Sequence, residues 1–139
     1  MIHSIFIIHE TLGCLIDVHC EPKLTEDPQL IGGYLVAFVQ LAREWLKDTI
    51  DEIQLQNSKL VFRQGEKTHL VALVSRDQAL TPGILECVNT ILDRFVEQFP
   101  WVESNQPRHF ESFAQWIAQQ LHQLKGPQDG DLICPITIS

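Results

Sequence analysis

The hydrophobic pattern of the first twenty residues predicts a β-hairpin. Residues 2–9 (IHSIFIIH) are rich in β-branched side chains, and residues 12–20 (LGCLIDVHC) resemble them. The segment ETLG between the two runs is a short turn, and its Gly13 can adopt a left-handed backbone conformation. Two antiparallel strands joined by this tight turn are therefore expected.

A helical pattern follows the hairpin. Asp27 and Pro28 form a typical helix start, with Asp27 as the N-cap and Pro28 at the first helical position. Helical periodicity then continues to about Lys47, through the uncharged run LIGGYLVAFV. At 100° per residue, the apolar side chains of this helix cover an arc of roughly 200°, whereas one sheet face buries a stripe little more than 100° wide. The helix therefore has more apolar surface than one sheet can cover.

The remaining arc of this helix carries two adjacent glycines with Val36 beside them. Their low profile predicts a side on which a second helix or strand can approach closely. A glycine in a helix interior costs roughly 1 kcal/mol relative to alanine, which favours a functional reason for the pair. The alternative is that the pair is merely tolerated, because burial of the other residues stabilises the helix. The predicted partner interface consists of Gly32, Gly33, Val36, Gln40 and Arg43.

The rest of the chain predicts three strands and two helices. The short runs IDEIQLQ, KLVFRQ and THLVALVS, at 50–56, 59–64 and 68–75, form a meander. A second helix begins at Thr81-Pro82 and ends before Pro100, and a third runs from Pro107 to Gly126. The tail DGDLICPITIS is apolar, but its proline limits it to an edge strand or an irregular extension.

The order ββ-α-βββ-α-α predicts an α+β fold with a five-stranded antiparallel sheet and helices on its faces. A length of 139 residues, with 45% apolar and 20% charged residues, is typical of one globular domain. The net charge of −8 argues against nucleic acids and anionic lipid surfaces as partners. No segment reaches the roughly 20 apolar residues of a membrane-spanning helix. The N-terminus lacks the features of a signal peptide, so a cytoplasmic protein with reduced cysteines is expected.

Candidate chemistry is sparse. The glycine pair fits neither a Walker loop nor a dinucleotide fingerprint, so no cofactor is expected. Histidines and cysteines gather in the first hairpin, where the expected register pairs His9 with Cys14 and His3 with Cys20. These pairs would lie roughly 20 Å apart, too far to share one metal ion. Cysteines that pack as small hydrophobic side chains are the preferred interpretation, and a ligand- or metal-sensing hairpin is the alternative.

No catalytic residue is predicted, so the chain is not expected to be an enzyme. The serines lack the GxSxG context of a nucleophile elbow, and Cys87 lies among apolar helix positions. Trp45, Trp101 and Trp116 lie near helix ends, where a large ring is expected to cover the core. A role as a partner anchor is the alternative for one of these tryptophans.

Four segments together resemble a longin domain, the profilin-like module of vesicle-trafficking proteins and small-GTPase regulators. They are IFIIHETLGCLIDV, DPQLIGGYLVAFVQLAREW, QLQNSKLVFRQGEKTHLVALVSRD and ILDRFVEQFP. The resemblance covers residues 1–125, and leaves residues 126–139 as a C-terminal extension without a counterpart. It implies an α-β-α sandwich with the first helix on one face of the sheet and the other two on the opposite face.

The resemblance also implies a non-catalytic protein-protein interaction domain without a cofactor. Such domains form homo- or heterodimers with another longin or roadblock domain, and contact small Ras-like GTPases or trafficking partners. A roadblock-type scaffold assembled through edge strands is an alternative. The hairpin that precedes the first helix argues against it, because roadblock domains generally begin with a helix.

Overall fold

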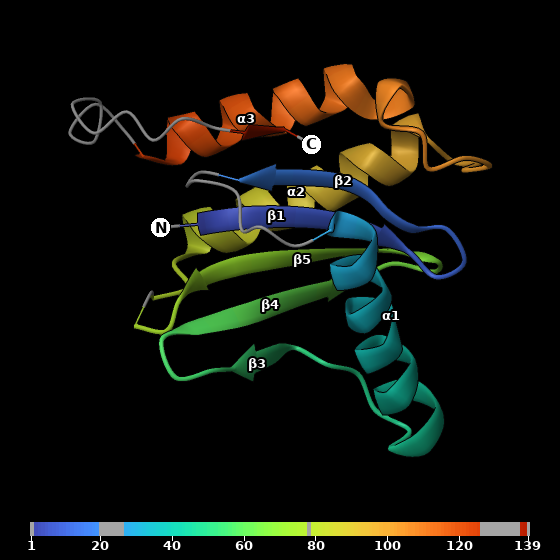
Figure 1. The fold of residues 1–139 in the computed structure, drawn as a ribbon. Coiled ribbons are helices and arrows are strands. Elements are labelled where there is room, and N and C mark those ends of the chain that lie inside the picture. Colours follow the sequence, from blue (N-terminus) through green and yellow to red (C-terminus); the bar gives the residue numbers. More distant parts are fainter. Residues whose placement is uncertain (1, 20–26, 78, 126–136, 139) are drawn as a thin grey trace.

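A computed structural model describes residues 2–19, 27–77, 79–125 and 137–138 of the chain. Its centre is an antiparallel sheet in the order β3-β4-β5-β1-β2-β6 (Figure 1). The strands are β1 Ile2–His9, β2 Gly13–His19, β3 Glu52–Gln54, β4 Ser58–Gln64, β5 Thr68–Ser75 and β6 Thr137–Ile138. β5 and β1 lie in the middle of the sheet, which explains why both are almost continuously apolar.

Two of the helices begin at the predicted capping residues, whereas the third begins at Glu111, after a 3-10 turn at its predicted start. The helices are α1 Pro28–Trp45, α2 Pro82–Gln98 and α3 Glu111–Lys125, and a 3-10 turn, Pro107–Phe110, leads into α3. Asp27 Oδ1 accepts a hydrogen bond from the Gln29 amide at 2.9 Å, and Thr81 Oγ1 accepts one from the Ile84 amide at 3.3 Å. α1 crosses one face of the sheet, whereas α2 and α3 cover the other (Figure 1).

The sheet separates two hydrophobic cores of different size. Successive strand residues face opposite sides, so Phe6 and Ile8 pack beneath α1 while Ile5 and Ile7 pack beneath α2 and α3. The core on the α2 and α3 side is the larger one, and it contains a cluster of phenylalanine rings around Phe95. α1 therefore buries much less of its surface than the other two helices bury together.

The predicted α+β fold and its order of elements are confirmed. The tail supplies a sixth strand, β6, at the edge beside β2. Residues 126–136 lie outside the described part of the chain, so the boundary between a 1–125 domain and an extension stays a prediction.

The predicted register of the first hairpin holds from Ser4, which pairs with His19, to Ile7, which pairs with Ile16, but the predicted pair of His9 with Cys14 was wrong. His9 pairs with Gly13 and Ile8 pairs with Cys14, and the register shifts between Ile7 and Ile8. The turn is one residue shorter than predicted because Gly13, at φ 80°, already belongs to β2. The second predicted pair, His3 with Cys20, includes a residue outside the described part of the chain.

Candidate protein-interaction surface

The inner face of α1 is held against β2 through a glycine contact. A Cβ atom added to Gly32 would lie 2.8 Å from the Cys14 amide nitrogen and 2.9 Å from the Cys14 Cβ, so only glycine allows this approach. Gln29 fixes the same place, because its Nε2 donates to the Cys14 carbonyl at 2.7 Å and its Oε1 accepts from the Cys14 amide at 3.2 Å. Burial raises the pKa of the Cys14 thiol to about 12, so this thiol is inert packing material beneath the helix.

This contact corrects the predicted orientation of α1. Gly32 is buried and Val36 is only 7% exposed, so neither faces away from the sheet as predicted. Gln40 is half-buried, whereas Gly33 faces open space, with no atom within 4 Å of an added Cβ. The physical reason is that glycine serves the helix-to-sheet contact itself. The predicted excess of apolar surface is present, but it lies on the side of the helix that is opposite to Gly32 and Val36.

Arg43 also turns toward the sheet, where an ion pair neutralises it. Its Nη2 donates to Glu10 Oε1 at 2.7 Å, and the fully buried His69 donates from Nε2 to the same oxygen at 2.9 Å. Burial acts to raise the pKa of Glu10, but the bonds from Arg43 and His69 outweigh it and the pKa lies below its ordinary value. Burial lowers the pKa of His69, partly opposed by Glu10. The cluster ties the C-terminal half of α1 to the β1-β2 turn and to β5.

The outer face of α1 is a continuous apolar stripe. Five residues at steps of four, four, three and four positions lie on one side of the helix. This outer stripe consists of Leu30 (49% exposed), Tyr34 (60%), Phe38 (42%), Leu41 (50%) and Trp45 (81%). Leu46, which follows the helix, is 71% exposed. Residues 28–42 contain no charged side chain, so no ionic group interrupts the stripe.

The outer stripe is the strongest candidate for a functional surface. Aromatic side chains present roughly 150–250 Å² each, and large contiguous apolar patches on soluble proteins mark interaction sites. The sequence analysis placed these residues on the wide apolar arc of the helix and predicted the interface on the remaining arc, which carries the glycines. A usable signal was present: small and β-branched residues, such as Gly32, Val36 and Val39, lie on one side of the helix and the aromatic residues lie on the other.

One of the three tryptophans covers the core, whereas the other two are exposed. Trp116 is half-buried and packs against Phe113 with ring centroids 5.2 Å apart, as expected of a ring that covers the core. Trp45 and Trp101 are 81% and 87% exposed, so the prediction that they cover the core was wrong. Trp45 extends the outer stripe, whereas Trp101 lies in the segment between α2 and the 3-10 turn.

A buried hydrogen-bonded chain links β1 to β2 on the α1 side of the sheet. Ser4 Oγ and His19 Nδ1 are 2.8 Å apart, and His19 Nε2 donates to Asp17 Oδ2 at 3.0 Å. The order resembles a nucleophile, base and acid. The sequence analysis did not single it out, although the predicted register already sets Ser4 opposite His19. All three residues are at most 4% exposed, so a substrate cannot reach the serine. The chain satisfies buried polar groups and fixes the register.

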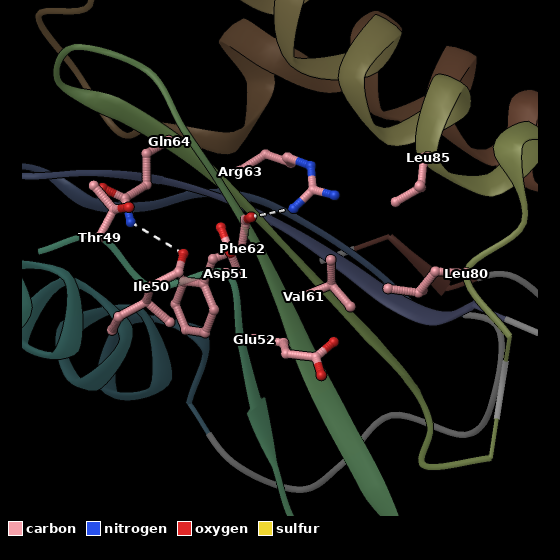
Figure 2. A pocket seen from close by; sticks show the side chains of 10 residues that line it. All are labelled: Thr49, Ile50, Asp51, Glu52, Val61, Phe62, Arg63, Gln64, Leu80 and Leu85. Atoms are coloured by element: carbon pink, nitrogen blue, oxygen red, sulfur yellow. Dashed lines mark hydrogen bonds between the residues drawn. The ribbon is translucent and has the colours of Figure 1, made fainter.

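A shallow hollow of about 490 Å³ lies at the β3-β4 edge (Figure 2). Arg63 spans it, with Nη1 donating to the Phe62 carbonyl at 2.7 Å and Nε donating to Asn89 at 3.1 Å. Asp51 and Glu52 add two carboxylates, but the lining residues include no histidine, cysteine or serine. The hollow therefore lacks the serine or cysteine nucleophile and the histidine base of a catalytic triad.

Two further properties concern the described residues as a whole. Within them, no group of three or more histidine, cysteine, aspartate or glutamate side chains is arranged to hold a metal ion. In the same part of the chain, none of the helices has the length and apolarity needed to cross a membrane.

The fold is similar to that of one chain of a known complex. One chain of a structure described as a homology model of the full-length AP-3 complex in a stretched open conformation superposes with a TM-score of 0.56. The match covers 94% of this chain and 98% of that chain, at 12% sequence identity. No family model and no curated protein sequence matches the chain. At this identity the likeness shows the shared fold, and the matched chain is itself a domain of this size.

Proposed function

We propose that this chain is a non-catalytic protein-interaction domain that takes part in a trafficking-type complex through the outer stripe of α1. The observation that carries the proposal is the uncovered stripe itself. Burial of a large aromatic or aliphatic side chain stabilises a complex by roughly 1.5–3 kcal/mol, whereas its exposure contributes nothing to this fold. Tyr34 and Trp45 are of the residue types favoured at binding hot spots.

Two lines of support favour a trafficking partner. The sequence resembles longin domains, and the fold is similar to a chain of the AP-3 complex model. We therefore propose another longin or roadblock domain, or a small Ras-like GTPase, as the partner class. The hollow is lined by no serine, cysteine or histidine, and the Ser4–His19–Asp17 chain is buried, which favours binding over catalysis.

Affinity capture with the tagged full-length chain tests this proposal. Leu41→Glu places a charge in the middle of the outer stripe, and Leu41 is half-exposed, so the fold should persist. Gln119→Glu makes the matched change on the exposed side of α3. A longin, roadblock or small GTPase partner should be captured by the wild type and by Gln119→Glu, and lost from Leu41→Glu. Retention of the same partner by a folded Leu41→Glu variant would contradict the proposal.

A further inference from the structure

We propose that protonation of His69 releases the C-terminal end of α1, so that the outer stripe binds its partner at neutral pH and loses it in mildly acidic conditions. The inference rests on the proposed function, because it assigns a means of regulation to the same surface. The groups that respond to pH are Glu10, Arg43 and His69. The released segment is residues 41–48, which carries the Leu41 and Trp45 end of the outer stripe.

The two halves of α1 are held against the sheet by different contacts. Between positions 32 and 39 the helix buries four residues, namely Gly32, Leu35, Val36 and Val39. Between positions 41 and 49, in contrast, Ala42 is the one buried residue. The C-terminal end of α1 therefore depends for its position on one small side chain and on the ion pair of Arg43 with Glu10.

The backbone at this end of α1 is strained. Lys47 has φ 53°, a left-handed conformation that glycine usually supplies after a helix. The amides of Leu46 and Asp48 both donate to the Ala42 carbonyl, at 3.2 Å and 3.0 Å. One carbonyl thus closes the helix, and opening of this end relieves the strain at Lys47. The ion pair of Arg43 is what opposes that opening.

Arg43 and His69 share one carboxylate oxygen. Arg43 Nη2 lies 2.7 Å and His69 Nε2 lies 2.9 Å from Glu10 Oε1. While His69 is neutral, Arg43 supplies the positive charge that balances Glu10. A positive charge on His69 leaves two cations for one carboxylate, and the two repel each other. Because His69 is fully buried and 44% of the Arg43 side chain is exposed, Arg43 is the group that turns to water.

The second nitrogen of His69 favours the same change. His69 Nδ1 is buried and has no hydrogen-bond partner among the described residues. A proton gained at this atom finds no acceptor, and a buried donor without a partner is costly. Water that enters beneath the opened end of α1 supplies the missing acceptor. Protonation of His69 and opening of α1 therefore favour each other.

The charges around His69 set the pH range of the release. Glu10 from the β1-β2 turn and Arg43 from α1 act on it, whereas its strand partners, Ile8 on β1 and Gln64 on β4, are uncharged. Burial lowers the pKa of His69 below its ordinary value of 6.5, partly opposed by Glu10. The pKa of Glu10 lies below its ordinary value of 4.5. Release is therefore expected below pH 6.5, where Glu10 is still ionised.

His9 is a further titratable group beside this cluster, and burial lowers its pKa too. Its Nδ1 accepts from the Thr11 amide at 3.2 Å and from the Leu12 amide at 3.3 Å. Protonation of His9 would therefore disturb the β1-β2 turn instead of displacing Arg43. His9→Asn keeps an acceptor at this place and removes the titration, so it serves as a control for the release of α1.

NMR titration of the full-length, nitrogen-15-labelled chain tests the release without any partner. The amides of residues 44–48 should shift and their heteronuclear NOE values should fall as the pH is lowered from 7 to 5. The midpoint should equal that of the His69 ring nitrogens, and the amides of residues 32–39 should keep their NOE values. Titration of the His69 ring without a change in residues 44–48 would overturn the inference.

Variants identify the groups that carry the response. Arg43→Gln removes the ion pair, so residues 44–48 should be mobile already at pH 7, whereas Arg43→Lys keeps a cation and should respond like the wild type. His69→Leu should keep residues 44–48 ordered at pH 5. His9→Asn and His122→Leu, an exposed position on α3, should respond like the wild type. An unchanged response in His69→Leu, or ordered residues 44–48 in Arg43→Gln at pH 7, would overturn the inference.

The captured partner separates this inference from the proposed function. The partner that the wild type binds at pH 7 should be released at pH 5, and His69→Leu should keep it at pH 5. Retention at pH 5 by the wild type overturns the inference and leaves the proposed function intact. Retention at pH 7 by a folded Leu41→Glu variant contradicts the proposed function instead, and the NMR titration still decides whether protonation releases α1.

Discussion

The outer faces of α1 and α3 differ in a way that the fold does not require. Both helices cover the sheet with an apolar inner face. α3 presents polar side chains to the outside, among them Glu111, Gln115 and Gln119. α1 presents aromatic and aliphatic residues there instead. Because a stripe little more than 100° wide suffices to cover a sheet, the outer residues of α1 serve something other than this chain's own core.

The largest effect should separate the two faces of α1. Val36→Glu places a charge in the small core beneath α1, and should cost several kcal/mol and unfold the chain. Leu41→Glu, on the outer face, should change the free energy of unfolding by about 1 kcal/mol or less. Urea denaturation followed by circular dichroism measures both. A folded, fully stable Val36→Glu variant would show that α1 is oriented the other way round.

The two adjacent glycines provide the next contrast. Gly32→Val should destabilise the fold by about 3 kcal/mol, because the new side chain collides with the Cys14 backbone. Gly33→Ala should stabilise it by roughly 0.5–1 kcal/mol, because alanine is the better helix former and open space surrounds the position. Equal effects of the two substitutions in urea denaturation would mean that α1 does not contact β2 through Gly32.

A smaller effect should distinguish how the two helices are anchored. α3 is held by phenylalanine contacts, whereas the C-terminal half of α1 is held by the Glu10–Arg43–His69 cluster. The pKa of His69 is lowered in the fold, so its contribution is present above its ordinary value of 6.5 and is lost as pH falls through the lowered value. The pKa of Glu10 is lowered too, so its contribution is present above 4.5 and is lost on further acidification.

Hydrogen exchange at pH 7 and pH 5 measures this difference. After correction for the intrinsic pH dependence of exchange, amides in the last turns of α1 should lose protection at pH 5 while those of α3 keep theirs. His69→Leu should reduce the change in α1, because it removes the group that becomes charged. Equal loss in both helices would indicate global destabilisation instead of a weakened anchor.

The contrast also shows what a sequence can reveal. The sequence correctly predicted where α1 and α2 begin, at Asp27 and Thr81, and the three-strand meander. Caps and turns can be predicted because they depend on neighbouring residues. The orientation of α1 could not be predicted in this way, because the 44% exposed Arg43 side chain pairs with Glu10 of the β1-β2 turn, which is distant in sequence. The Ser4–His19–Asp17 chain was not singled out, although the predicted register already sets Ser4 opposite His19, because hydrogen bonds between buried side chains depend on their orientations as well as on the pairing of the strands.

The interface proposed from the structure lies on the same helix as the interface predicted from the sequence, but on another face of it. Gly33 lies beside the outer stripe, whereas Gly32 and Val36 lie in the helix-to-sheet contact. The width of its apolar arc indicates that α1 has more apolar surface than the sheet covers. Which part of that surface stays uncovered depends on the close approach of Gly32 to Cys14.

Photo-cross-linking inside the native cell tests most directly whether the outer face of α1 binds protein. Benzoylphenylalanine replaces Leu41 in one form of the full-length chain and Gln119 in another, because both positions are exposed and lie on helices that cover opposite faces of the sheet. Irradiation should give a discrete protein adduct from position 41, either with a second copy or with another protein, and none from position 119. Absence of an adduct at position 41, or equal adducts at both positions, would contradict the account.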